Sequence, residues 1–224
     1  MRVYNVLLLI VAPTVAVIAG MAIGLFAPGT LSFILFICGT GLVYGCGQYY
    51  ALYGPTLRAK KSTRDKVARC LLEELKGKLE KLADSRVRSG GQRPSIRLNV
   101  MDVRGGLLRN RYLQMAVCTT GYREAEVELQ WLVGQGACGL AWREKRQVAG
   151  GGDDFTSDTL SNTQREVCRD VKSVLSTPIK PRNRRIQGIM NVDSTVQTAA
   201  QLRLKKQDVQ DIAQVYGDII AELY

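Results

Sequence analysis

The first quarter of the chain is apolar throughout, whereas the rest mixes apolar and charged positions. Between Val3 and Leu57 the sequence contains no Lys, Arg, Asp or Glu. A turn at Pro28 divides this stretch into two apolar segments, 6–27 and 31–53, each a little over 20 residues long. A helix of that length crosses the hydrocarbon core of a bilayer, which is about 30 Å thick. The pattern predicts two transmembrane helices, with a cleaved signal peptide as the alternative for the first.

A helical repeat follows the apolar stretch. Its apolar positions recur at intervals of 4, 3, 4 and 3 residues and are Ala68, Leu72, Leu75, Leu79 and Leu82. This spacing predicts one apolar helix face of just over two heptads. A parallel coiled coil between two chains and a helix packed on its own domain both fit this face.

A second helix is expected at the end of the sequence. Its apolar positions have the same spacing and are Val209, Ile212, Tyr216, Ile219 and Leu223. Asp208 precedes them and is the expected N-cap. This helix is a candidate partner for the first one.

Between the two helices the sequence is typical of strands. Five segments are expected to be extended: 95–103, 112–119, 127–132, 173–179 and 186–192. Helix, antiparallel sheet and helix together predict an α+β fold. The expected organisation is a transmembrane hairpin over 1–57, a basic segment with a linker helix over 58–90, and a globular domain over 91–224.

Charge indicates the orientation in the membrane. Arg2 precedes the first span, and six basic residues follow the second: Arg58, Lys60, Lys61, Arg64, Lys66 and Arg69. Positive flanks stay on the cytoplasmic side, so both termini and the globular domain are expected in the cytoplasm, with the hairpin in the cell inner membrane. The net charge of +11 predicts binding to anionic lipid rather than to nucleic acid, because the sequence contains no recognised nucleic-acid-binding motif.

The residue types limit the chemistry. The sequence has no His, which removes His-based general bases and Ser-His or Cys-His nucleophile pairs. The cysteines form no C-x-x-C pair, so neither a metal site nor a disulfide framework is expected. The segment 134–139 matches G-x-G-x-x-G, but no acidic ribose ligand follows at the required distance. We interpret its glycines as a tight turn into a helix beneath a pocket.

Three segments in order carry a resemblance to a known family. They are 134–142 (GQGACGLAW), 171–179 (VKSVLSTPI) and 186–194 (IQGIMNVDS), followed by a closing helix that begins at 207 (QDVQDIA). Together they resemble the core of a GAF domain over residues 65–224. The resemblance implies a six-stranded antiparallel sheet with helices on one side, a small-molecule pocket on the other, and a homodimer.

The resemblance also implies a function. Known GAF domains bind cyclic nucleotides, tetrapyrroles or other small regulators; the absence of His argues against haem and bilin ligands, and no cofactor is assigned. The expectation is a membrane-tethered, non-catalytic sensor or interaction module. Pocket position in the family and side-chain chemistry suggest seven ligand-binding residues: Trp131, Gly136, Cys138, Trp142, Asp153, Asp154 and Asp193, with Asp153 and Asp154 in a lid loop.

An enzymatic branch of the family is an alternative. Free methionine-(R)-sulfoxide reductases are GAF domains with a similar turn, which Cys138 matches, and Cys168 lies near the position of their nucleophile. Glu128 stands where those enzymes have a further cysteine, and Asn191 replaces the first Asp of their D-x-D-S motif. These departures favour a protein without catalytic activity.

The output of such a sensor has two candidate routes. A protein partner could carry it, because the sequence shows no kinase, cyclase or DNA-binding domain. Alternatively, the spans themselves could be a membrane-disrupting effector of bacterial antiviral defence, gated by the GAF domain. The motifs Gly20-x-x-x-Gly24 and Gly41-x-x-x-Gly45 would then let the helices pack closely when the domains cluster.

Overall fold

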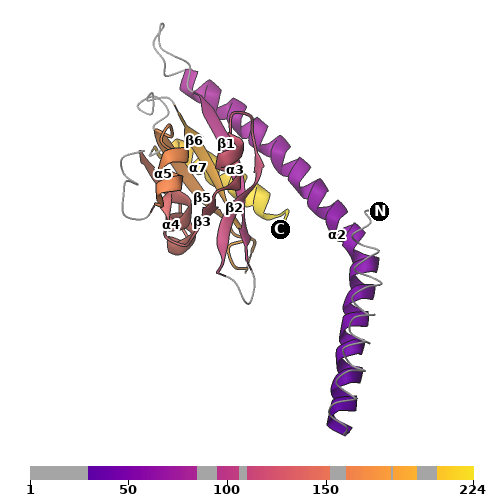
Figure 1. The fold of residues 1–224 in the computed structure, drawn as a ribbon. Coiled ribbons are helices and arrows are strands. Elements are labelled where there is room, and N and C mark those ends of the chain that lie inside the picture. Colours follow the sequence, from indigo (N-terminus) through magenta and orange to yellow (C-terminus); the bar gives the residue numbers. More distant parts are fainter. Residues whose placement is uncertain (1–29, 85–94, 106–109, 152–159, 183, 196–205) are drawn as a thin grey trace. The chain divides into compact units, whose positions relative to one another are not determined.

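The computed structural model describes residues 30–84, 95–105, 110–151, 160–182, 184–195 and 206–224. The chain divides into two compact units, Met1–Thr63 and Arg64–Tyr224. Helix α2 (Thr30–Asp84) begins in the first unit and ends in the second, and Pro55 lies inside it (Figure 1).

The expected transmembrane hairpin is not seen in this structure. The first predicted span, 6–27, lies outside the described residues, and the second, 31–53, falls within α2. In the described part of the chain, no helix is long and apolar enough to cross a membrane.

The second unit is built on an antiparallel sheet of six strands. They are β1 (Ile96–Arg104), β2 (Tyr112–Cys118), β3 (Gln130–Trp131), β4 (Val148–Gly151), β5 (Ser173–Ile179) and β6 (Gly188–Ser194). Their order in the sheet is β3-β2-β1-β6-β5-β4. The helices of this unit after α2 are α3 (Glu124–Glu128), α4 (Gly136–Glu144), α5 (Asn162–Val167) and α7 (Gln207–Ala221). The predicted α+β architecture, an antiparallel sheet flanked by helices, is confirmed.

Two strand predictions were wrong in detail. The segment expected as a strand over 127–132 begins inside α3 and contributes only the two residues of β3. Helix forms there because Glu126 reaches back and accepts a hydrogen bond from the backbone N–H of Arg123, which caps the helix start. Strand β4 was not predicted, because its two glycines have low β-propensity.

The sheet is buried on both faces, and alternate residues of β1 point to opposite sides. Ile96, Leu98 and Val100 pack into the hydrophobic core beneath α2 and α7. Met101 belongs to a second hydrophobic cluster on the other face, where α4 lies. Figure 1 shows α4 and α5 on the side of the sheet away from α2.

The heptad face of α2 packs on its own domain. Leu72, Leu75 and Leu79 are fully buried and share a core with Val209 and Tyr216 of α7. The predicted pairing of the two helices is therefore confirmed, and the hydroxyl of Tyr216 donates to Glu74 Oε1 at 2.6 Å.

The start of α7 differs slightly from the prediction. Lys206 occupies the N-cap, and Asp208 lies in the first turn instead. An acidic side chain in the first turn still interacts favourably with the helix dipole.

Candidate ligand-binding site

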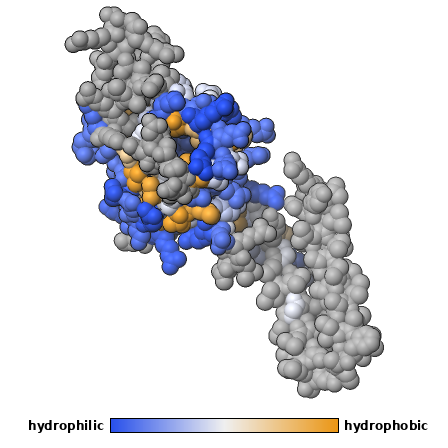
Figure 2. All heavy atoms as spheres, turned by 60° about the vertical axis from the view of Figure 1, so that its left-hand side comes forward, coloured by the Kyte–Doolittle hydropathy of each residue, from blue (hydrophilic) through white to orange (hydrophobic). Residues whose placement is uncertain are grey.

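A cavity of about 120 Å³ opens on the face of the sheet that carries α4. On the side of the molecule turned forward in Figure 2, hydrophobic residues gather within a hydrophilic surround. The apolar lining of the cavity consists of Met101, Met115, Trp131, Ala137, Leu160, Val171 and Val174. For comparison, a buried apolar cavity of roughly 150 Å³ accommodates benzene. The cavity is somewhat smaller than that and therefore suits a compact organic molecule.

Glycines bring the start of α4 to the edge of this cavity. Gly134 and Gly136 have φ angles of +86° and +56°, which L side chains rarely adopt. A Cβ on Gly139 would lie 2.4 Å from the carbonyl oxygen of Leu132, so only glycine fits there. Helix α4 starts at Gly136, and its first turn places Cys138 in the cavity wall. The G-x-G-x-x-G segment is therefore a turn into a helix beside a pocket, as interpreted from the sequence.

An ion cluster forms one end of the cavity. Arg97 Nε lies 2.7 Å from Asp193 Oδ1, and Arg97 Nη2 lies 3.0 Å from Glu126 Oε1. All three side chains are less than a tenth exposed. Arg97 also donates from Nη1 to the backbone carbonyl of Gly121 at 3.0 Å. The guanidinium is thus committed to protein acceptors.

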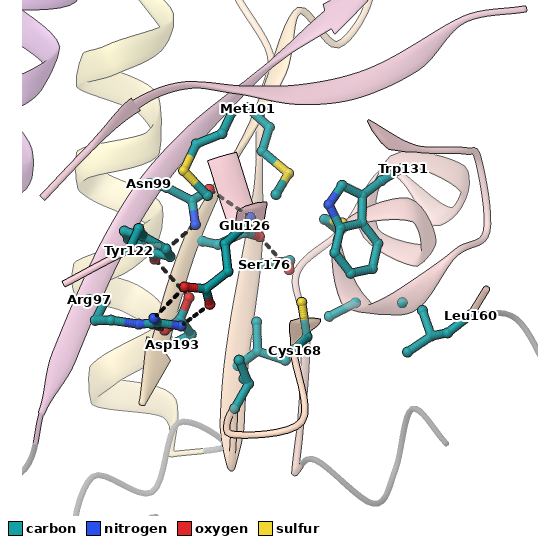
Figure 3. Close-up of a pocket in the computed structure, with 17 residues that line it drawn as sticks. Arg97, Asn99, Met101, Tyr122, Glu126, Trp131, Leu160, Cys168, Ser176 and Asp193 are labelled. Carbon is teal, nitrogen blue, oxygen red and sulfur yellow. Dashed lines mark hydrogen bonds and ion pairs between the residues drawn. The ribbon is translucent and has the colours of Figure 1, made fainter. Parts of the chain in front are cut away.

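A chain of hydrogen bonds continues from this cluster across three strands (Figure 3). The hydroxyl of Tyr122 donates to Asp193 Oδ2 at 2.7 Å and accepts from Asn99 Nδ2 at 2.9 Å. Asn191 Nδ2 donates to Asn99 Oδ1 at 3.0 Å, and Ser176 Oγ lies 2.6 Å from Asn191 Oδ1. The sheet register creates this chain of hydrogen bonds, because Asn191 of β6 lies opposite Asn99 of β1 on one side and opposite Ser176 of β5 on the other.

Burial dominates the electrostatics of this end of the cavity. Removal from water raises the pKa of Asp193, although the neighbouring Arg97 opposes the effect. The pKa of Tyr122 is also raised, by burial and by the negative charge of Asp193. In the part of the chain that the structure describes, no group of three or more His, Cys, Asp or Glu side chains is placed to hold a metal ion.

Two cysteine thiols line the cavity. Burial raises the pKa of Cys138 to about 12. The pKa of Cys168 is also raised to about 12, first by burial and then by the charges of Glu126 and Asp193. Both thiols are therefore protonated near neutral pH, and a protonated thiol is a poor nucleophile. Cys168 is partly buried, Cys138 is buried, and Cys70 of α2 is exposed.

The indole of Trp131 forms part of the apolar wall. Only 8% of this residue is exposed, and its Nε1 has no hydrogen-bond partner among the described residues. In Figure 3 the ring nitrogen lies on the edge of the indole that faces the other lining residues. A buried N–H group without an acceptor is costly, so this group is a ready donor for a bound molecule.

Four of the seven residues predicted to bind a ligand line the cavity: Trp131, Gly136, Cys138 and Asp193. Trp142 does not line it; this residue packs against the adjoining hydrophobic cluster, with the Arg111 guanidinium 5.7 Å from its ring centre. Asp153 and Asp154 lie outside the described residues.

The sequence prediction missed the partners of Asp193. Arg97, Tyr122 and Glu126 were not identified, although all three line the cavity. One available signal was the alternation at the start of β1, where Arg97 and Asn99 stand between the apolar Ile96, Leu98 and Val100. Polar residues at every second position of a strand that is buried on both faces indicate an internal polar site.

The fold and the pocket define a GAF-like module. No family model matches the sequence, and no curated protein matches it. Among solved structures, the chain is similar to the GAF domain region of a protein from Geobacter sulfurreducens PCA, with a TM-score of 0.53 and 13% identity over 75% of this chain and 97% of that one. It is also similar to the type II free methionine-R-sulfoxide reductase from Thermoplasma acidophilum, with a TM-score of 0.52 and 14% identity over 73% of this chain and 94% of that one. At these identities the comparisons show a GAF-like fold.

Proposed function

We propose that the protein is a membrane-tethered sensor that binds a small molecule in its GAF-like domain without transforming it. The observation that carries this proposal is the cavity of about 120 Å³, which has apolar walls and a buried polar network at one end. Ligand pockets in proteins have this composition, with a few convergent polar groups in an apolar surround. The GAF-like fold supports the assignment.

The absence of catalysis is part of the proposal. A cysteine enzyme needs a thiolate, and burial holds both cavity thiols in the protonated form near neutral pH. The remaining polar side chains are joined to one another by hydrogen bonds, as expected for a binding surface that is set before the ligand arrives.

The membrane tether and the partners rest on the sequence. Residues 3–57 carry no charge, and a basic cluster follows directly after them. The tether would hold the domain at the cytoplasmic face of the inner membrane, where the basic cluster attracts anionic lipid. A homodimer and a separate protein that carries the output complete the proposal.

Native mass spectrometry of the full chain tests ligand binding. The protein is released from uncharged detergent micelles, then denatured, and the extract is analysed for small molecules. Retention of one compound by the wild type and its loss from Val174→Phe, a substitution that fills the cavity from β5, support a sensor. Equal small-molecule content in the two proteins would contradict ligand binding in this cavity.

A reductase is the second candidate. It is favoured by one observation, the presence of Cys138 and Cys168 in the wall of the same cavity. Incubation of the full chain with free methionine-(R)-sulfoxide and a dithiol reductant discriminates between the two functions. Methionine formation that disappears in Cys168→Ser would establish the enzyme, whereas no turnover by the wild type supports the sensor.

A further inference from the structure

The charge of the cavity limits what it can bind. Among the described residues that line it, Arg97 is the one cation, while Glu126 and Asp193 are both acidic. The guanidinium of Arg97 already contacts Asp193, Glu126 and the Gly121 carbonyl. No lining cation is left for a phosphate or carboxylate, and the lining residues carry one negative charge in excess. The half-exposed Arg123 lies 3.5 Å from Glu126 but does not line the cavity, so Asp193 is the carboxylate left for a ligand.

The carboxylate of Asp193 can accept a further hydrogen bond from a ligand. Each carboxylate oxygen of Asp193 accepts one hydrogen bond in the structure, from Arg97 and from Tyr122 respectively. A carboxylate oxygen can accept two, so capacity remains on both. The two carboxylates also act within the cavity: after burial, Glu126 and Asp193 are the main causes that raise the pKa of the Cys168 thiol, and Arg97 and Arg123 oppose them.

The indole of Trp131, by contrast, needs a hydrogen-bond acceptor. Trp131 is more than nine-tenths buried, lines the same cavity and donates to no acceptor in the part of the chain that the structure describes. In Figure 3 its ring stands on the side of the cavity away from Arg97 and Asp193. A ligand that extends between the two ends would meet a hydrogen-bond donor at one and a negative charge at the other. Met101 and Met115 supply apolar contacts to its middle.

We propose that the cavity selects a compact organic cation that carries one hydrogen-bond acceptor, with its positive end on Asp193 and its acceptor on the Trp131 indole N–H. This proposal rests on the proposed function, since it requires the cavity to bind a ligand. It excludes nucleotides and other anionic regulators as occupants, because their charge would add to that of the two carboxylates.

Four probes test the selection, and the three that are not anionic have the same number of non-hydrogen atoms. 3-Methoxypropylamine has both features; pentylamine lacks the acceptor, 1-methoxybutane lacks the charge, and 4-methoxybutanoate reverses the charge. Their affinities for the full chain in uncharged detergent are compared by ligand-observed NMR titration. We expect 3-methoxypropylamine to bind at least about tenfold more tightly than 1-methoxybutane, and 4-methoxybutanoate not to bind.

Substitutions then assign the two contacts. Trp131→Phe keeps an aromatic side chain but removes the N–H donor, and it does not alter the residues of the ion cluster. It should abolish the preference for 3-methoxypropylamine over pentylamine, which we expect to be about fivefold or more in the wild type. Asp193→Asn should remove the preference for the amine over 1-methoxybutane, and circular dichroism establishes that this variant is folded.

The outcomes separate this proposal from the proposed function. Equal or tighter binding of the uncharged or anionic probe would overturn the proposal while leaving ligand binding in place. A preference for 3-methoxypropylamine over pentylamine that survives Trp131→Phe would likewise overturn the assigned acceptor contact. Failure of all four probes to bind, together with no co-purified compound, would overturn both.

Discussion

Arg97 and Asp193 face each other on adjacent strands, with Arg97 Nε 2.7 Å from Asp193 Oδ1 and both side chains more than nine-tenths buried. Two charges removed from water are tolerated only while they remain paired. The same arginine also balances Glu126 of α3, so one guanidinium joins β1, β6 and a helix at the end of the cavity. This arrangement makes Arg97 a structural requirement of the site.

Replacement of Arg97 should therefore destabilise the domain strongly. Arg97→Met removes the buried cation that pairs with both Asp193 and Glu126, which then keep only the Tyr122 hydroxyl and Arg123, respectively. We expect a loss of about 3–5 kcal/mol in the free energy of unfolding. Denaturant unfolding of the full chain, followed by far-UV circular dichroism, measures this loss.

A surface pair provides the control. Arg146 lies 2.6 Å from Glu144, but its side chain is 71% exposed. Arg146→Met should cost less than about 1 kcal/mol. Similar losses for the two variants would contradict the role assigned to Arg97.

The turn before α4 should not tolerate a side chain at Gly139. Gly139→Ala would place a Cβ against the backbone of Leu132 and Gly134, and we expect a loss of about 1–3 kcal/mol. Gly77→Ala is the control, because nothing lies within 4 Å of that position in α2. A helical Gly→Ala change in open space should stabilise the protein by roughly 0.5–1 kcal/mol. Thermal unfolding of both variants gives opposite shifts if the turn is packed as described.

The buried face of α2 should belong to the core of the second unit. Leu75 is fully buried, so Leu75→Ala should cost about 2–5 kcal/mol. Val67, on the same helix, is 40% exposed, and Val67→Ala should change stability by no more than about 0.5 kcal/mol. If Leu75→Ala left the unfolding of the domain unchanged, α2 would not pack on the sheet in solution.

The cavity thiols should be slow to react near neutral pH. An ordinary thiol has a pKa of about 8.5, whereas burial raises that of Cys138 and of Cys168 to about 12. The reactive thiolate is therefore scarce, and its fraction should increase tenfold per pH unit until about pH 12.

Peptide mapping after brief treatment with iodoacetamide at pH 8 measures the reaction at each cysteine. We expect modification of Cys168 to be at least about a hundredfold slower than that of the exposed Cys70. Equal rates at Cys70 and Cys168 would indicate a stabilised thiolate and would favour the reductase.

The sequence predicts local features of this fold better than distant ones. The spacing of Leu72, Leu75 and Leu79 predicts a buried helix face, because helical periodicity can be recognised within one short segment of sequence. The bounds of β5 likewise agree with the prediction, since β-branched residues such as Val174, Thr177 and Ile179 favour a strand. Short or glycine-rich elements such as β3 and β4 have no comparable local signal.

The candidate site shows the same difference between local and distant features. Asp193 could be chosen from a resemblance in its own segment, but its partner Arg97 is 96 residues away. Only the pairing of β1 with β6 brings them together, and no local pattern specifies which strands become neighbours. Trp142 illustrates the converse: an aromatic residue on α4 looked like a cavity wall, yet the helix turns it towards the adjoining hydrophobic cluster.

The most direct test of ligand binding in this cavity uses the two tryptophans of the chain as probes. With ¹⁵N-labelled tryptophan, the full chain gives one indole N–H resonance from Trp131, which lines the cavity, and one from Trp142, which does not. On addition of 3-methoxypropylamine, we predict that the Trp131 resonance shifts with saturation while that of Trp142 stays unchanged. A titration in which Trp131 does not move, or in which both resonances move equally, would contradict the binding of this compound in the cavity.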